Sequence, residues 1–187
     1  MKPTSKPSLY ILFWFALFLT FSVSGQNLTN NWKQELNGSL QRYLSCDGST
    51  ECNTLMAESL NKVFNVKDFY SSKLGRHMVV SEMCEYLKNS AQWKLIGHAY
   101  EQKALAEAQD FANSKKAILA VYLDAEGIGN VAVILPGELN PSGSWGFSVP
   151  NSASFNPSNP DMSYIDKGLS YAFAKTHIKN VLIYGRN

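Results

Sequence analysis

The spacing of apolar positions changes period beyond the middle of the chain. From residue 28 to about residue 112, apolar side chains recur every three or four positions, which is typical of helices that bury one face. After Asn113-Ser114 the pattern becomes short runs of branched apolar residues, which indicate strands. We predict helices over residues 28–45, 52–64, 77–87 and 98–112, and strands over residues 117–123 and 131–135.

The two predicted strands are joined by a turn that contains Gly127 and Gly129, which favours an antiparallel hairpin. Residues 138–163 are rich in Ser, Asn, Pro and Gly, with Trp145, Phe147 and Phe155 interleaved. A short helix over 167–175 and a last strand over 180–184 complete the pattern. Helices first and an antiparallel sheet afterwards predict an α+β domain.

The first 25 residues have the pattern of a secretory signal peptide. Lys2 and Lys6 precede an apolar run over residues 10–21, and small residues lead up to Gly25, after which cleavage is predicted. A membrane anchor is the alternative, but the run is shorter than the ~20 apolar residues that span a bilayer. We therefore expect residues 26–187 to form a single domain, secreted or periplasmic, with no integral membrane span.

Removal of this leader changes the charge balance. The whole chain has 17 basic and 15 acidic residues, and the leader carries two lysines and no acid. The remaining domain is formally neutral. It has no basic excess of the kind that nucleic-acid binding requires, and we predict no nucleic-acid partner.

The chain has three cysteines, Cys46, Cys52 and Cys84, so at least one is unpaired within a monomer. We expect Cys52 to be free and Cys46 and Cys84 to be either paired or reduced. A Cys46–Cys52 bridge is the alternative, and it would abolish any nucleophile at Cys52. No spacing such as Cys-x-x-Cys or His-x-x-x-His occurs, so no metal site and no cofactor are predicted.

Cys52 lies at the start of a predicted helix, where Ser49 or Thr50 can act as the N-cap. Free amide groups and the helix dipole lower the pKa of a thiol in the first turn, which favours a nucleophile. The alternative is a small apolar residue on the buried stripe of the helix.

A helix that begins with a cysteine, followed far downstream by the strand Gly129-Asn130-Val131-Ala132-Val133, resembles the NlpC-type and CHAP-type papain-like cysteine hydrolases of bacterial cell walls. The resemblance covers residues 45–185. It implies a papain-like fold in which N-terminal helices, including the Cys52 helix, pack on an antiparallel sheet. It also implies an amidase or endopeptidase that cleaves peptidoglycan peptides, with Cys52 as nucleophile, Asn130 at the base position and Asn151 as the orienting polar residue.

The departure from the family is Asn130, because the strand of these hydrolases usually begins with the catalytic histidine. An amide cannot accept a proton near neutral pH, and general acid–base catalysis is worth about 10²–10⁴-fold. Either the domain is catalytically impaired, a pseudoenzyme, or another base such as His98 replaces the histidine. A non-catalytic secreted module that binds wall peptides or a protein partner is the alternative function. His98 also suits a capping or packing role, and Asn151 a simple turn.

Three further residues are predicted to contact substrate. Asn53 follows the cysteine, and Ser144 and Trp145 lie in a segment that combines glycines, hydroxyls and rings. The alternative for Trp145 is that its ring fills the end of the sheet.

Overall fold

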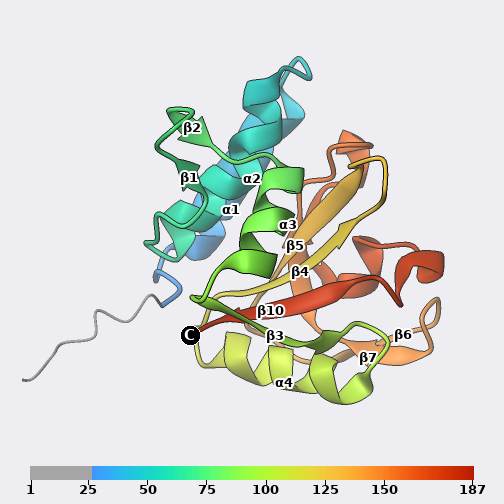
Figure 1. Ribbon diagram of the computed structural model, residues 1–187. Helices are drawn as coiled ribbons and strands as arrows, with labels where there is room; N and C mark the ends of the chain where they lie inside the picture. Colours follow the sequence, from blue (N-terminus) through green and yellow to red (C-terminus); the bar gives the residue numbers. More distant parts are fainter. Residues whose placement is uncertain (1–26) are drawn as a thin grey trace, which may run out of the picture.

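The computed structural model describes residues 27–187, and the predicted signal peptide lies outside the described residues (Figure 1). Within that range the protein is α+β, as predicted. Its α-helices are α1 (Trp32–Leu44), α2 (Thr50–Val63), α3 (Val80–Asn89) and α4 (Gln102–Asn113). Its strands are β1 (Tyr70–Ser71), β2 (Arg76–His77), β3 (Trp93–His98), β4 (Ile118–Leu123), β5 (Gly129–Ile134), β6 (Asn140–Ser142), β7 (Phe147–Val149), β8 (Asn151–Ser154), β9 (Tyr164–Gly168) and β10 (Leu182–Arg186).

Six of these strands form the central sheet in the order β3-β10-β4-β5-β8-β9, and every neighbouring pair is antiparallel. The predicted hairpin is confirmed, because β4 and β5 pair over their whole length with Val121 opposite Val131. Gly129 is required at the start of β5, since a Cβ there would lie 2.1 Å from the carbonyl oxygen of Tyr122.

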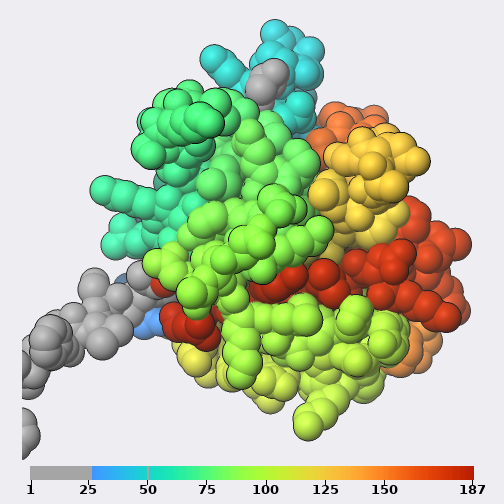
Figure 2. Space-filling model, in the orientation of Figure 1, coloured from blue at the N-terminus to red at the C-terminus, as the bar shows by residue number. Residues whose placement is uncertain are grey.

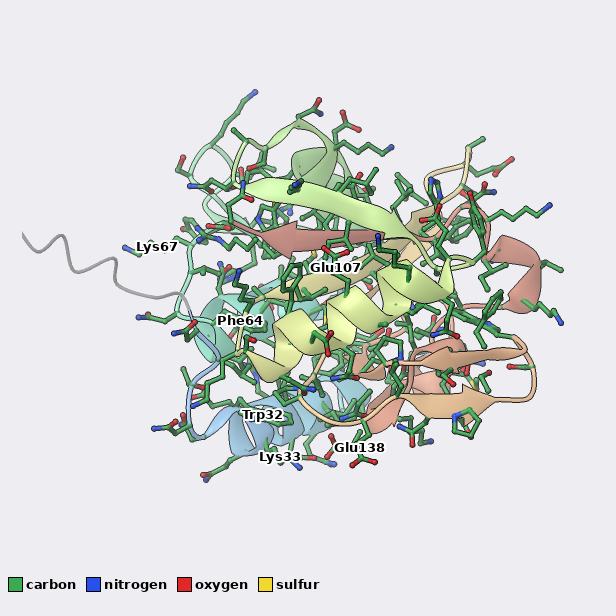
Figure 3. The ribbon with its side chains drawn as sticks, turned by 90° about the horizontal axis from the view of Figure 1, so that it is seen from below. Trp32, Lys33, Phe64, Lys67, Glu107 and Glu138 are labelled. Carbon is green, nitrogen blue, oxygen red and sulfur yellow. A yellow bond between two sulfur atoms is a disulfide. The ribbon has the colours of Figure 1, made fainter. Side chains whose placement is uncertain are left out.

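The two faces of the sheet bury different sets of side chains. Helices α1, α2 and α3 cover one face, where Val131 and Val133 of β5 join their core (Figure 1). Helix α4, which carries the labelled Glu107 in Figure 3, lies across the other face, where Ala132 and Ile134 are buried. We call these the α1–α3 face and the α4 face. Successive β5 residues point to opposite faces because the side-chain period of a strand is two.

Two predicted helices are wrong in part. The helix predicted over residues 98–112 begins only at Gln102, and His98 instead ends β3, which pairs with β10. The helix predicted over residues 167–175 is the end of β9 followed by short 3₁₀ turns. His98 pairs in β3 with the distant strand β10, and the segment up to Gly168 pairs in β9 with β8. In both places strand pairing overrides the local helical pattern.

A buried ion pair ties the last strand to the connection after α2. Arg186 Nη2 donates to Asp68 Oδ1 at 3.0 Å, and the Nε group donates to Asp68 Oδ2. The indole Nε1 of Trp93 donates to the same carboxylate at 2.9 Å. Both charged side chains are only 7% exposed. Removal of either partner would leave the other charge buried without compensation.

We predict that Asp68→Ala lowers the free energy of unfolding by about 3–5 kcal/mol, because it leaves the Arg186 guanidinium and the Trp93 N–H buried without an acceptor. Urea denaturation followed by circular dichroism measures the change. Lys33→Ala is the matched control: it breaks the exposed Lys33–Asp166 pair and should cost less than about 1 kcal/mol. Equal effects of the two variants would contradict the prediction.

Candidate functional site

The predicted nucleophile is bonded to another cysteine. Cys46 and Cys52 form a disulfide with their Cα atoms 5.9 Å apart, so the prediction that Cys52 is free is wrong. The turn between α1 and α2 brings the two sulfurs together. In that turn Asp47 Oδ1 accepts the Ser49 N–H at 2.9 Å, and Gly48 has a φ of 82°. Cys52 does lie in the first turn of α2, as predicted.

The remaining cysteine is not a second candidate nucleophile. Cys84 is a free thiol in the middle of α3 and is buried against the sheet. Burial raises the pKa of the Cys84 thiol to about 11, so almost none is thiolate at neutral pH.

Asn130 is buried, and its amide bonds within the protein. Its Nδ2 group donates to the Ala172 carbonyl at 3.0 Å. Its Oδ1 atom accepts the Val131 N–H at 2.9 Å and the Ser154 hydroxyl at 3.1 Å. The side chain therefore links β5 to β8 and to the chain after β9, and its carbonyl oxygen already accepts two hydrogen bonds.

Cys52 and Asn130 belong to opposite sides of the sheet. Leu55 and Met56, on the same helix as Cys52, pack in the core of the α1–α3 face. Asn130 shares its side of β5 with Ala132, which packs on the α4 face together with Ala172. The hypothesis that the two side chains face each other across one groove is wrong. The reason is the alternation of β5, which points Val131 and not Asn130 toward the helices.

The structure does not bring the other predicted catalytic residues to Asn130. Asn151 begins β8 and pairs beside Leu135, so it lies five residues along the strand from Asn130, roughly 17 Å at ~3.4 Å per residue. Its amide donates to the Pro136 carbonyl and to Asp166. His98 is three strands away from Val131, roughly 14 Å at ~4.8 Å per strand, and its Nδ1 lies 3.1 Å from the Lys179 carbonyl.

The sequence did not single out the buried serines of β8, of which Ser154 contacts Asn130. Ser152 and Ser154 are fully buried on β8, and Ser152 Oγ lies 2.8 Å from the Tyr164 hydroxyl. Desolvation by burial raises the pKa of Tyr164 well above its usual value. The alternation of Ser and Ala in β8 was a usable signal, but Ser-rich segments more often form loops.

Trp145 is only 3% exposed, and its indole N–H donates to the Phe173 carbonyl at 3.2 Å. Its ring is buried in the core of the α4 face and leaves almost no surface for a substrate, so its role is packing, in line with the alternative prediction for this residue. The exposed Ser144 lies in a separate groove, formed between the β6–β7 hairpin and the turn after β9.

Asn53 lines a cleft where the start of α2, the start of α3 and the β4–β5 turn meet. We call this the α2–β5 cleft. It has a volume of about 370 Å³. In Figure 2 the yellow β4–β5 turn stands beside green α3 at this place. Cys52 and Asn130 are next in sequence to the lining residues Asn53 and Gly129, but neither of their side chains lines the cleft. Its lining residues are all uncharged: Asn53, Val79, Val80, Ser81, Gly127, Ile128, Gly129, Pro157 and Ser158.

Over residues 27–187, no cluster of three or more His, Cys, Asp and Glu side chains is placed to hold a metal ion. In the same range no helix combines the length and apolarity needed to cross a bilayer. No protein-family model matches this sequence, and no curated protein matches it.

We predict that a thiol reagent finds no reactive cysteine in the native, oxidised protein. One thiol should react after denaturation without reductant, and three after denaturation with reductant, because Cys84 is buried and the other two are bridged. Absorbance titration with Ellman's reagent gives the counts. One rapidly reacting thiol in the native protein, mapped to Cys52 by mass spectrometry, would contradict the disulfide.

We also predict that Asn130→Ala lowers the free energy of unfolding by about 1–3 kcal/mol, because the Ala172 carbonyl and the Ser154 hydroxyl lose a buried partner. Thermal unfolding measures the loss. Asn180→Ala, at an exposed position, is the control and should change stability by less than about 0.5 kcal/mol. If Asn130→Ala leaves the free energy of unfolding unchanged, the amide does not stabilise the fold.

Proposed function

We propose that this protein is an exported, non-catalytic module that binds peptidoglycan peptides in the α2–β5 cleft. The observation that carries the binding proposal is the open, uncharged α2–β5 cleft, and the separation of the two expected catalytic positions is what makes the module non-catalytic. Cys52 is bridged on one side of the sheet, and Asn130 is hydrogen-bonded on the other. The cleft between the elements that bear them remains open.

The lining of the cleft suits a peptide. Val79 and Ile128 offer aliphatic contacts, and Ile128 is 57% exposed. Asn53 and Ser81 add an amide and a hydroxyl, groups that pair with peptide N–H and C=O. Ligand sites of this kind combine apolar contact area with a few polar groups that fix orientation.

Two observations support the exported location. The first 25 residues have the signal-peptide pattern. The Cys46–Cys52 disulfide is the kind of bond that persists outside the reducing cytoplasm.

Turnover is not expected from this arrangement even after reduction. A free Cys52 thiol would face no imidazole from β5, because residue 130 is an amide directed to the α4 face. Without a group that takes the thiol proton and returns it to the leaving amine, the acyl-transfer step lacks its general acid and base.

The test is co-sedimentation of the protein with purified peptidoglycan, together with analysis of the soluble fraction for released fragments. We expect binding without release, both with and without reductant. Ile128→Asp should weaken binding at least about tenfold, because it places a charge against an apolar contact. Leu74→Asp is the matched control, since Leu74 is also an exposed aliphatic residue (52%) but does not line the cleft.

Two results would overturn the proposal. If the wild-type protein releases peptide fragments and Cys52→Ala does not, the protein is a cysteine hydrolase and the proposal is wrong. Equal loss of binding in Ile128→Asp and Leu74→Asp, or no binding by wild type, would remove the cleft as the peptide site.

A further inference from the structure

A second groove lies between the β6–β7 hairpin and the 3₁₀ turn Leu169–Tyr171. We call it the hairpin groove, and its volume of about 500 Å³ exceeds that of the α2–β5 cleft. Its lining residues are all uncharged: Asn140, Pro141, Ser142, Gly143, Ser144, Val149, Gly168, Ser170 and Tyr171. It thus offers a ring, hydroxyls and an amide.

The Tyr171 ring is held in place and still exposed. Lys167 Nζ lies 5.2 Å from its centroid, and the Tyr164 ring packs near it at a centroid distance of 6.0 Å and an angle of 61°. The residue nevertheless keeps 56% of its surface exposed. A large ring that packs against a buried tyrosine and stays open to solvent offers contact area to a ligand.

The hydroxyls opposite the ring are also ordered. Ser142 Oγ lies 3.1 Å from Ser144 Oγ and accepts the backbone N–H of Trp145 at 3.3 Å. Trp145 is itself anchored in the core, so the hairpin tip is fixed to the sheet. Ser144 is exposed and carries a hydroxyl that both donates and accepts.

Two glycines that line the groove differ in the space around them. A Cβ at Gly168 would lie 2.9 Å from Val149 Cγ2, and both residues line the groove. Gly143 at the hairpin tip is surrounded by open space, since a Cβ at this residue would meet no atom within 4 Å.

We propose that the hairpin groove is a binding site for a neutral oligosaccharide chain, with one pyranose face stacked on Tyr171 and its hydroxyls bonded to Ser144, Ser170 and Asn140. A sugar ring presents C–H groups on its faces and hydroxyls around its edge, which matches a ring flanked by hydroxyls and an amide. The site is separate from the α2–β5 cleft and does not depend on peptide binding there.

The experiment is a titration of the ¹⁵N-labelled protein, from residue 26 to residue 187, with the tetrasaccharide of N-acetylglucosamine, which carries no peptide. We expect amide shifts centred on Gly143, Ser144 and Ser170. Tyr171→Ala should bind about tenfold more weakly because it removes the stacking surface, and Tyr171→Phe should bind as wild type does.

Tyr100→Ala is the matched control, because Tyr100 is likewise an exposed tyrosine (42%) but lies outside the groove. Ser144→Trp, which fills the groove from an exposed position, should also abolish binding without disturbing the core. Shifts that map elsewhere, no shifts at saturating sugar, or equal binding by Tyr171→Ala and wild type would overturn the proposal. A stem peptide without sugar tests the α2–β5 cleft independently, so the two proposals fail separately.

Discussion

The alternation of side chains along β5 is the constraint on which the rest of the structure depends. Val131 and Val133 complete the core beneath α1, α2 and α3, and this fixes Asn130 and Ala132 on the α4 face. A shift of one residue would exchange two fully buried sets of side chains, so the register is strongly specified. The same alternation separates Asn130 from the Cys52 helix, and that separation is the basis for a non-catalytic interpretation.

The buried polar side chains of Asp68, Arg186 and Asn130 are matched to partners, and each match joins distant parts of the chain. The Asp68–Arg186 pair connects the segment after α2 to the last strand, and Asn130 connects β5 to the chain after β9. Such groups cost free energy when a partner is removed, so they act as constraints on topology more than as sources of net stability. The Asn130 amide already bonds three groups within the protein, so it has little hydrogen-bonding capacity left for a substrate.

The two open sites differ in chemistry in a way that follows from their elements. The α2–β5 cleft is lined by aliphatic residues from helix starts and a hairpin turn, whereas the hairpin groove presents a tyrosine ring and hydroxyls. Both lack charged lining residues. Polymers that combine peptide and sugar segments would present a suitable ligand to each.

The sequence by itself determined the α+β class, the four helical segments approximately, and the β4–β5 hairpin, because local apolar periods specify them. It also indicated that Cys52 lies in the first turn of a helix. Only the tertiary structure decided that Cys52 pairs with Cys46, that His98 ends an edge strand, and that Asn130 faces away from α2. The physical reason is that disulfide pairing, strand order and the buried face of each strand depend on contacts between residues far apart in the chain, which local periodicity does not record.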